Sequence, residues 1–405
     1  MKVLVFTTVF PSREMPNFGI FVRERMRRVA DLCDVKVIAP VPFFPFAGVI
    51  KRNYAIKHPR IEHQGNLEVH HPRFFVIPGL FKFLDGFFLF LSTIFAVSKL
   101  RKDFDFDLID AHFAYPDGFA AVLLGQLFKR PVVITLRGTL NRLIRYRLRR
   151  AMIKVALNRA ARIFSVSPHL IQLAEESEAR PVKYRIIPNG VDTQHFKRVT
   201  QKVARANIGI DEGTKVIISV GGLVERKGHH RVIEALPQLV GKFPDIIFLV
   251  VGGPSVEGDI SSELRMQIQR LGLENHVRLV GEVPHDQVSM YLSAADIFVL
   301  ATRYEGCPNV FLEAMACGLP VVTTLVCGNE YIVEPGRSGL LVPFGDKARL
   351  GEALQDALTS DWNHQQIIEY AHSRTWENVA KEVVTQFDEV LNDKLNQVSM
   401  YHMEA

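Results

Sequence analysis

Hydrophobic residues along this chain fall into two alternating kinds of segment. Short, continuous runs of Val, Ile, Leu and Phe are typical of strands that are buried on both faces of a parallel sheet. Longer segments between them, such as 228–242 and 286–294, place apolar residues at helical spacing. The predicted strands are Lys2–Thr8, Val35–Pro40, Leu67–Phe75, Leu108–Ala111, Val132–Leu136, Ile163–Val166, Arg185–Ile187, Lys215–Val220, Ile246–Val251, Val277–Val280, Ile297–Leu300, Val321–Thr324 and Gly339–Val342. The βαβα pattern runs through the chain twice, which predicts an α/β protein with two doubly wound domains.

A polar stretch separates the two repeats of this pattern. Pro188-Asn189-Gly190 is typical of a turn, and residues 192–207 are polar before a new strand begins at Lys215. Near the end of the chain, residues 376–392 predict one long amphipathic helix. The expected organisation is an N-terminal domain of residues 1–195, a C-terminal domain of residues 196–375, and a crossover helix and tail over residues 376–405.

The composition is that of an ordinary globular protein. Of 405 residues, 48% are hydrophobic and 23% are charged, which excludes disordered, collagen-like and coiled-coil chains. The four cysteines include no C-x-x-C pair, so we expect neither a disulfide scaffold nor a zinc ribbon, but reduced thiols in a cytoplasmic protein. No signal-peptide pattern is expected at the start. The most apolar region, 74–97, is interrupted by Lys82 and Asp85, so we expect it to touch a membrane surface at most, not to span it.

The two halves of the chain carry opposite net charge. Residues 1–195 contain 30 Lys and Arg against 16 Asp and Glu, whereas the remainder contains 19 against 27. This asymmetry indicates that the two domains have different partners, one of which is anionic.

The most informative segment runs from residue 305 to residue 320. It follows the predicted strand 297–300, and Pro308 suits the start of a helix. Ligands of open α/β sheets bind at the carboxyl ends of the strands, and helix amides at that edge attract anions such as a diphosphate. Glu305 and Glu313 are suited to accept hydrogen bonds from a ligand that carries several hydroxyl groups.

A glycine-containing loop follows the predicted strand 215–220. Gly221 and Gly222 let the backbone approach a phosphate, and Arg226 or Lys227 supplies positive charge to it. The loop is neither a dinucleotide fingerprint nor a Walker loop, because G-x-G-x-x-G and Gly-Lys-Ser/Thr are both absent. A nicotinamide-dependent oxidoreductase is therefore disfavoured.

Together these segments resemble glycosyltransferase family 4. The resemblance rests on the Glu305–Glu313 spacing, the loop that ends in Lys227-Gly228, Pro188-Asn189-Gly190-Val191-Asp192 and Asp110-Ala111-His112, in the family order. Members are retaining enzymes of the GT-B fold. The resemblance therefore implies two Rossmann-like domains that face a central cleft, with a C-terminal helix that crosses back to the N-terminal domain. It also implies an acceptor bound by the first domain and a nucleotide-sugar donor bound by the second.

The resemblance implies roles for individual residues. Glu305 would hold the donor sugar near its reacting carbon, Lys227 would neutralise the diphosphate, and His112 would contact the sugar, so these three are the implied catalytic residues. Glu313 would bind the ribose. The remaining implied donor-binding residues are Gly19, Gly222, Arg226, Gly306, Cys307, Pro308, Asn309, Val310 and Glu330.

Two positions depart from the family pattern. Gly222 stands where many members carry a phosphate-binding arginine, for which Arg226 is the candidate replacement. Arg137 stands where many members carry a histidine, and it is expected either to reach an anionic acceptor or phosphate or to join a structural ion pair. For Glu330 a structural role and a role near the donor remain equally open.

Neither a metal nor a cofactor is expected, because the family is generally metal-independent. The acidic run 103–107 lies on a polar loop and is expected to be solvated, and the clustered histidines lack the spacing of a zinc site. A UDP- or GDP-sugar is the expected co-substrate. Deprotonation of the acceptor by the leaving phosphate or a backbone carbonyl, and a covalent route through a carboxylate, both remain open.

Residues 139–162 form a strongly basic segment with eight Lys and Arg and no Asp or Glu. Helical spacing predicts one amphipathic helix that could lie on an anionic membrane or pack its apolar side on the sheet. No motif for reading nucleic acid accompanies the charge, so no nucleic-acid partner is expected. The predicted apolar face comprises Leu140, Ile144, Leu148, Ala151 and Val155.

The sequence thus predicts a retaining glycosyltransferase that moves a sugar from a nucleotide-diphosphate donor to a glycan or lipid-linked acceptor, in polysaccharide or glycolipid biosynthesis. We expect it in the cytoplasm, in peripheral contact with the anionic inner face of the plasma membrane. The alternatives are a non-hydrolysing nucleotide-sugar epimerase and an inactive sugar-nucleotide-binding partner subunit. The sequence does not indicate an oligomeric state.

Overall fold

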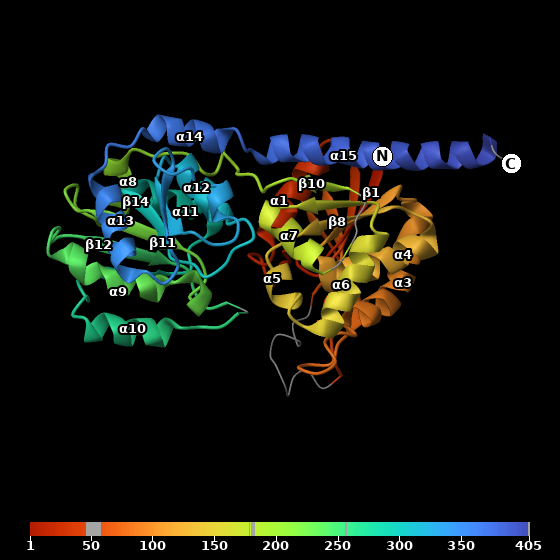
Figure 1. The fold of residues 1–405 in the computed structure, drawn as a ribbon, viewed down its shortest axis with the longest axis horizontal. Helices are drawn as coiled ribbons and strands as arrows, with labels where there is room; N and C mark the ends of the chain where they lie inside the picture. The colour runs from red at the N-terminus through yellow and green to blue at the C-terminus, as the bar shows by residue number, and fades with distance from the viewer. Residues whose placement is uncertain (46–57, 178, 180–182, 256, 404–405) are drawn as a thin grey trace. The chain divides into compact units, whose positions relative to one another are not determined.

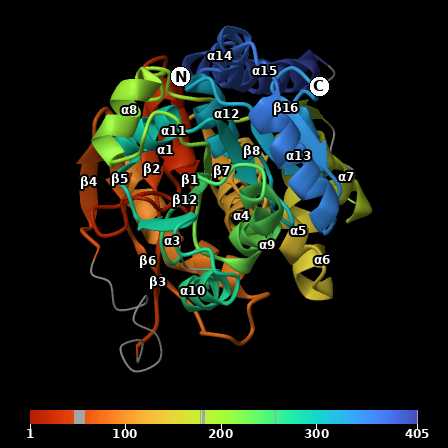
Figure 2. The ribbon, with the colours of Figure 1, turned by 90° about the vertical axis from the view of Figure 1, so that its left-hand side faces the viewer.

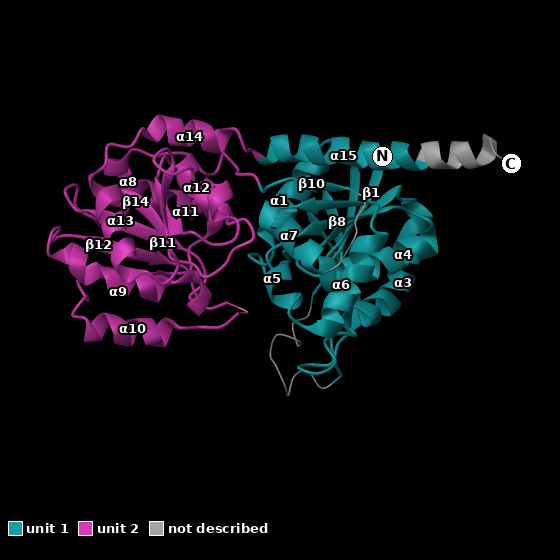
Figure 3. Cartoon of the chain, in the orientation of Figure 1, with its two compact units in different colours: residues 1–189, 376–405 teal, residues 190–375 magenta. Residues whose placement is uncertain are grey.

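The computed structural model describes residues 1–45, 58–177, 179, 183–255 and 257–403 (Figure 1). The chain divides into two compact units (Figure 3). Unit 1 comprises residues 1–189 and 376–405, and unit 2 comprises residues 190–375. The first change of unit therefore lies at residue 189, whereas the sequence analysis places it at residue 195.

Unit 1 is built on an eight-stranded sheet in the order β10-β9-β8-β7-β1-β2-β5-β4. Its neighbouring strands are parallel except at the edge, where β4 is antiparallel to β5. Strands β3 and β6 form a separate parallel pair. The bounds are β1 (Lys2–Phe6), β2 (Asp34–Ile38), β3 (Val41–Phe43), β4 (Ile61–Gln64), β5 (Leu67–His70), β6 (Arg73–Phe75), β7 (Leu108–His112), β8 (Val132–Leu136), β9 (Arg162–Ser165) and β10 (Tyr184–Ile186).

Helices cover both faces of this sheet because its central strands are apolar on both sides. On one face, α1 and α15 pack on Val3, Val5 and neighbouring strand residues, and Met26 and Phe387 are fully buried there. On the other face, α4 packs on β7 and β8 and also contacts α3 and α6. The helix bounds are α1 (Ile20–Val29), α3 (Asp85–Asp103), α4 (Phe119–Phe128), α5 (Leu140–Leu143), α6 (Arg147–Arg159), α7 (Pro168–Glu176) and α15 (Trp376–Met403), with a short helical turn, η2, over Ala114–Gly118.

Unit 2 is built on a six-stranded, wholly parallel sheet in the order β13-β12-β11-β14-β15-β16. Its strands are β11 (Val216–Val220), β12 (Ile247–Val251), β13 (Val277–Gly281), β14 (Ile297–Leu300), β15 (Val321–Thr324) and β16 (Gly339–Val342). Its helices are α8 (Gln201–Ile208), α9 (His229–Val240), α10 (Ser261–Arg270), α11 (Val288–Ala294), α12 (Asn309–Ala316), α13 (Lys347–Thr359) and α14 (His364–His372), with short helical turns η3 (Glu225–Lys227), η4 (His285–Gln287) and η5 (Asn329–Tyr331).

Successive strand residues of unit 2 alternate between two apolar cores. Ile217 of β11 packs with residues of α9, α10 and α13 on one face. Ile218 packs with residues of α11, α12 and α14 on the other. Figure 2 shows α13 running beside β16 in this arrangement. Two parallel Rossmann-like sheets with helices on both faces are the GT-B architecture, so the predicted fold class is confirmed.

The structure corrects the predicted strand 67–75. Residues Leu67–His70 form β5 of the large sheet, whereas Arg73–Phe75 form β6 of the two-stranded sheet. Pro72 lies between them and has no N–H to donate, while its carbonyl accepts a hydrogen bond from Val41 N. A proline at this position ends one strand and lets the chain change sheets.

The prediction of one basic helix over residues 139–162 is also wrong. The segment forms two helices, α5 and α6, and Arg162 belongs to strand β9. The buried face of α6 is Ile153, Ala156 and Leu157, while the predicted apolar residues Leu148 and Ala151 are exposed. Arg162 is buried and bonds to three side chains of α15, namely Gln386, Glu389 and Asp393.

The last helix, α15, starts at Trp376 as predicted but continues to Met403. It belongs to unit 1, where Trp376, Val383 and Phe387 complete the core beside α1. The predicted crossing of the C-terminal helix back to the N-terminal domain is therefore confirmed. Within the described residues, no helix combines the length and the apolar composition that crossing a bilayer requires.

Candidate active site

Two loops meet where the strand order of unit 2 reverses. Strands β11 and β14 are neighbours, but the chain leaves β11 towards β12 on one side and β14 towards β15 on the other. Such a switch point opens a crevice at the carboxyl ends of the two strands. The loop after β11 carries Lys227, and the loop after β14 carries Glu305. The topology alone therefore brings the two predicted residues together.

The Glu305 carboxylate is buried and receives three hydrogen bonds. Its Oε1 accepts from Lys227 Nζ at 2.8 Å, from Arg226 Nη1 at 2.9 Å and from Thr302 Oγ1 at 3.1 Å. Burial opposes ionisation of this group, but the charges of Lys227 and Arg226 outweigh it and hold the pKa of Glu305 below its ordinary value. Glu305 is therefore a charged acceptor at neutral pH, fixed by two cations.

Arg226 is occupied by protein groups. Besides Glu305, it bonds to Glu257 through Nε at 2.9 Å, and its guanidinium lies 5.2 Å from the ring centre of Tyr304. Burial disfavours the charged guanidinium, but the Glu305 and Glu257 carboxylates raise the pKa of Arg226 above its usual range. A phosphate would have to compete with both carboxylates for this side chain, so Lys227 is the better placed of the two cations.

The glycine loop of unit 2 is held by a buried histidine that the sequence analysis missed. His229 is fully buried, with Nδ1 3.1 Å from Ser219 Oγ and Nε2 3.2 Å from the carbonyl oxygen of Gly222. Because a carbonyl only accepts, Nε2 carries the proton. Burial lowers the pKa of His229 to about 4, so the ring is neutral. Gly228 has a positive φ, and a Cβ there would collide with the carbonyl oxygen of Ala301 in the other loop.

Helix α12 begins at the same edge of the unit 2 sheet. Pro308 precedes its first residue, and Phe311 and Leu312 anchor it in the core. The predicted residues Gly306 and Pro308 are buried, whereas Cys307, Asn309 and Val310 are half-buried. The first turn of α12 thus lies at the carboxyl-end edge of the sheet, where the start of a helix attracts anions.

Glu313 lies further along α12 and is half-buried. Its Oε1 is 3.7 Å from Nε2 of His285, which packs edge-on against Phe196 at 5.1 Å between ring centres. Glu330 is exposed on η5, and the buried neighbour Asn329 holds that turn by donating to Thr323 Oγ1 and to the carbonyl of Thr324. The structure does not bring Glu330 into contact with Glu305.

Unit 1 has an equivalent switch point between β1 and β7. Gly19 ends the loop after β1 with φ of 83°, and a Cβ there would lie 2.7 Å from the carbonyl oxygen of Val9. This left-handed conformation and close contact both require glycine. His112 is the last residue of β7, and Arg137 directly follows β8.

His112 is fully buried and both of its ring nitrogens face protein groups. Nδ1 lies 3.1 Å from Arg137 Nη2, and Nε2 lies 3.3 Å from Oδ2 of Asp110. Arginine only donates, so Nδ1 is the acceptor and Nε2 carries the proton. Burial lowers the pKa of His112 to about 4. The neutral ring is therefore held by Arg137 at Nδ1, while Nε2 lies near Asp110 without a hydrogen bond of good geometry.

Arg137 and Arg25 surround this histidine as buried cations. Arg137 is 4% exposed, donates to Asn189 Oδ1 at 3.1 Å, and lies over the ring of Phe21. Arg25 donates to Thr135 Oγ1 at 3.3 Å. Burial opposes the charge of Asp110, but His112, Arg25 and Arg137 hold the pKa of this carboxyl below its usual value. Sequence reasoning missed Arg25 because nothing local marks a helical arginine as buried.

Asp117 is a further buried residue that sequence reasoning did not assign. It accepts hydrogen bonds from Thr8 N at 3.0 Å, Thr8 Oγ1 at 2.8 Å and Thr7 Oγ1 at 3.3 Å. Burial raises the pKa of Asp117 to about 7. The carboxyl joins the loop after β1 to the segment after β7, and its place in a Pro-Asp-Gly turn after a strand was the available signal.

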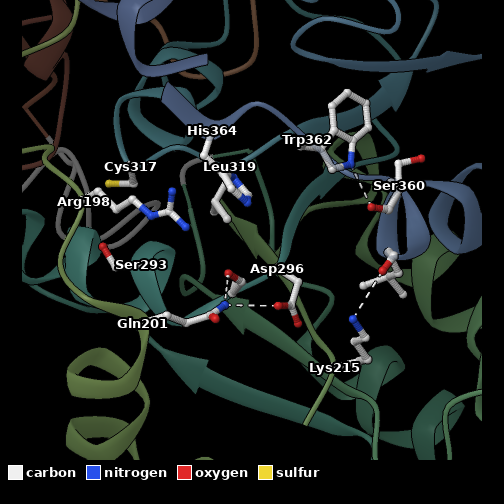
Figure 4. A pocket seen from close by; sticks show the side chains of 13 residues that line it. Arg198, Gln201, Lys215, Ser293, Asp296, Cys317, Leu319, Ser360, Trp362 and His364 are labelled. Atoms are coloured by element: carbon white, nitrogen blue, oxygen red, sulfur yellow. Dashed lines mark hydrogen bonds between the residues drawn. The ribbon is translucent and has the colours of Figure 1, made fainter. Parts of the chain in front are cut away.

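A separate small pocket of unit 2 lies at the opposite edge of the sheet (Figure 4). It has a volume of about 170 Å³ and is lined by residues that precede strands, such as Lys215 before β11 and Asp296 before β14. It therefore lies away from the loops that carry Lys227 and Glu305. Among the described residues, no group of three or more His, Cys, Asp and Glu is arranged to hold a metal ion.

Two family models, one for each half, together match most of the chain. Residues 21–195 match the family described as Glycosyltransferase Family 4, and residues 200–374 match Glycosyl transferases group 1. TuaC of Bacillus subtilis (strain 168), provisionally named a teichuronic acid biosynthesis glycosyltransferase, is 29% identical over 97% of this chain and 96% of its own length. A D-inositol 3-phosphate glycosyltransferase of Corynebacterium urealyticum is 31% identical over 55% of each chain.

Solved structures share the fold over nearly the full length. Sucrose-phosphate synthase from Thermosynechococcus elongatus has a TM-score of 0.79 at 21% identity, covering 97% of this chain and 99% of that one. HepE from Anabaena in complex with UDP has a TM-score of 0.73 at 20% identity, covering 96% and 100%. WaaG, a glycosyltransferase involved in lipopolysaccharide biosynthesis, has a TM-score of 0.67 at 18% identity, covering 95% and 98%.

Proposed function

The chain is a glycosyltransferase of family 4 with a GT-B fold, and from that premise we propose that it transfers a sugar from a nucleotide-diphosphate donor to a glycan or lipid-linked acceptor with retention of anomeric configuration. The observation that carries the proposal is the Lys227–Glu305 pair at the unit 2 switch point. A carboxylate is suited to sugar hydroxyls and a neighbouring cation to a diphosphate, and the pair lies at the edge where such folds bind ligands, which supports the proposal.

In the proposed reaction the bond between the anomeric carbon and the diphosphate oxygen breaks, and the oxygen keeps the electron pair. Lys227 and the first amides of α12 stabilise the negative charge that develops on that oxygen. The acceptor hydroxyl oxygen bonds to the anomeric carbon, and its proton passes to the leaving phosphate. A UDP-sugar is the first donor to test, because HepE is similar in fold and has been solved with UDP-glucose.

The remaining residues of the crevice serve the donor in this proposal. Glu313 binds the ribose hydroxyls, and Glu305 holds the hydroxyls of the sugar. Gly222 leaves the backbone open to the phosphates. His112 supports the edge of the unit 1 sheet through its neutral ring, because the ring is fully buried and Arg137 occupies Nδ1.

We place the acceptor on unit 1 and the enzyme at the cytoplasmic face of an anionic membrane. The excess of Lys and Arg in residues 1–195 supports an anionic partner for this half. The similarity to TuaC, which is named for teichuronic acid biosynthesis, supports a cell-envelope polysaccharide or glycolipid as the product class. No metal or cofactor takes part in this proposal.

The test measures nucleotide release from UDP-, GDP- and ADP-sugars by the purified protein and by three variants. Lys227→Met and Glu305→Gln are expected to lower the rate about 10²- to 10³-fold, as removal of one charge-stabilising group does elsewhere. The control, Glu352→Gln, changes an exposed carboxylate that pairs with its helical neighbour Arg349 on α13. Full activity in Lys227→Met, or isomerisation of the donor without transfer, would overturn the proposal.

A further inference from the structure

Helix α3 of unit 1 lacks the polar outer face of an ordinary surface helix. Over residues 85–98 its most exposed side chains are Phe87, Leu91 and Phe95, which are 45%, 51% and 79% exposed. They are spaced four residues apart and so follow one line along the helix. The opposite side, with Leu89 and Val97, is buried against the rest of unit 1. This helix is therefore apolar both where it packs and where it meets solvent.

The chain that leads into α3 extends this surface. Leu80 and Phe81 are 62% and 54% exposed. Together with the three helical residues they form what we call the apolar stripe: Leu80, Phe81, Phe87, Leu91 and Phe95. Large apolar side chains that are contiguous in this way mark contact surfaces on soluble proteins, because water would otherwise have to cover them.

Basic residues flank the apolar stripe. On the helix itself, the next two exposed positions after Phe95 are Lys99 and Lys102. Near the start of the helix, the Tyr115 hydroxyl of η2 accepts from Gly86 N and donates to the carbonyl of Lys82. Helix α6 also packs on η2, and its Arg149 acts electrostatically on both Asp85 and Tyr115. The α5–α6 segment therefore lies near the start of α3, and it carries the exposed arginines Arg142, Arg145, Arg147 and Arg150.

We propose that the apolar stripe and these flanking Lys and Arg residues form the surface by which unit 1 docks on an anionic lipid bilayer. The proposal deepens the membrane contact proposed above by naming its surface. Apolar side chains enter the acyl boundary while the cations remain at the lipid phosphates, as in other helices that lie in the interface. Lysines at the end of the stripe can keep their ammonium groups at the headgroups.

The surrounding charge favours a bilayer over a second copy of the chain. Two copies that paired through the stripe would bring like charges of their α3 and α5–α6 segments together, which is unfavourable. An anionic lipid surface instead neutralises them. The buried face of α6 explains why that helix contributes charge and not insertion, since its apolar residues Ile153 and Leu157 face the core of unit 1.

The first experiment measures binding of the full chain to vesicles by sedimentation. Vesicles of phosphatidylglycerol and phosphatidylethanolamine are compared with vesicles of phosphatidylcholine alone. Wild type is expected to bind the anionic vesicles at least tenfold more tightly. Phe95→Ser is expected to weaken that binding about tenfold or more, because one phenylalanine no longer enters the apolar phase. The matched control is Met266→Ser, at a comparably exposed position (62%) on α10 of unit 2.

The second experiment reports insertion directly. Phe95→Trp places an indole in the stripe, and Met266→Trp places one on α10 as the control. Brominated acyl chains in anionic vesicles are expected to quench the added fluorescence of the Phe95→Trp protein and to leave that of the Met266→Trp protein unchanged. The native Trp362 and Trp376 remain in both proteins and provide a common baseline.

Each failure has a distinct meaning. No binding by wild type, equal binding to both vesicle types, or binding that Phe95→Ser leaves intact would overturn the docking surface. A dimer in solution that Phe95→Ser dissociates would also overturn it, in favour of a second copy. Nucleotide release from a soluble donor is measured on the same samples. Normal release without vesicle binding defeats only the docking proposal, whereas absent release with binding defeats the proposed transferase reaction.

Discussion

Both units gather charged residues at the point where their strand order reverses, but they treat these residues differently. In unit 2, Glu305, Lys227 and Arg226 retain 10–17% of their side-chain exposure. In unit 1, Asp110 and His112 have none. A ligand can therefore exchange places with an ion-pair partner in unit 2, whereas in unit 1 the same kind of cluster is sealed beneath the surface.

The difference indicates that a switch point can serve two purposes. In unit 2 the polar groups remain partly accessible and balance one another's charge, which suits the binding surface that we propose there. In unit 1 they form a support, in which Asp110 and Arg137 fix the ring of His112 and Asn189 fixes Arg137. The two clusters thus share a position in the topology and differ in exposure, and the exposure determines whether their side chains are accessible to a ligand.

The largest expected effect comes from removing the central carboxylate in each unit. Asp110→Asn leaves buried Arg25 without its main counter-charge, and we expect it to lower the free energy of unfolding by about 3–5 kcal/mol. Glu305→Gln is expected to cost only about 1.5 kcal/mol, because Arg226 keeps Glu257 and the groups remain within reach of water.

Urea unfolding of both variants measures this contrast. Trp376 lies in the core of unit 1 and Trp362 packs on the cores of unit 2, so variants with a single tryptophan report each unit separately. Equal losses for Asp110→Asn and Glu305→Gln would show that the two clusters are equivalent after all.

A smaller difference is expected in the pH dependence of the two units. Folding lowers the pKa of His112 and of His229 from 6.5 to about 4. Each histidine therefore contributes stability that is complete above pH 6.5 and is lost as the pH falls towards 4, by about 3 kcal/mol. Asp117 acts in the opposite sense. Its pKa rises from 3.8 to about 7, so its contribution is complete below pH 3.8 and is lost as the pH rises through 7.

Asp117, whose contribution opposes that of His112, lies in unit 1. Unit 2 is therefore expected to lose stability more steeply between pH 6.5 and pH 4. Unit 1 also holds further residues whose effects on the pH dependence of stability oppose one another: the pKa of His58 and of His71 is lowered, and the pKa of Asp85 and of Glu382 is raised. Unfolding of the single-tryptophan proteins across this pH range gives the two slopes. Asp117→Asn should then steepen the slope of unit 1, and parallel slopes in all proteins would contradict the assignment.

The smallest effect concerns the two buried histidines themselves. Both are expected to carry the proton on Nε2 at pH 7, His112 because of Arg137 and His229 because of Gly222. Nitrogen-15 spectra of the imidazole rings identify the tautomer. Arg137→Met removes the donor at Nδ1 and should change the His112 signal while leaving that of His229 unchanged. A proton on Nδ1 of His112 in the wild-type protein would refute the arrangement.

Most of the fold follows from local pattern. Continuous apolar runs identified the central strands, because strands buried on both faces leave no room for polar residues. The exceptions depend on partners far along the chain. Arg162 looks like part of a basic helix until α15 supplies Glu389 and Asp393, more than two hundred residues later. The short strands β3 and β4 went unpredicted because they lie at edges and carry few buried residues.

The candidate site was predictable to the extent that it lies on loops after strong strands. Glu305 and Lys227 satisfy that condition, and the parallel topology then places their loops side by side. The buried residues that hold the site's elements together do not satisfy this condition. Asp117 meets Thr8, and Arg25 meets Thr135, only after helices and strands have packed. No spacing in the sequence encodes such contacts, since they depend on which strands become neighbours.

The position of α15 has a consequence for synthesis on the ribosome. The two ends of unit 2 lie side by side, where Val191 bridges to Thr375, and all of unit 2 is synthesised before α15. Unit 1 cannot complete its hydrophobic core until later, because Trp376, Val383 and Phe387 of α15 belong to that core. The sequence of unit 2 is therefore complete before that of unit 1, and an early stop codon that spared the whole of unit 2 would still leave the core of unit 1 unfinished.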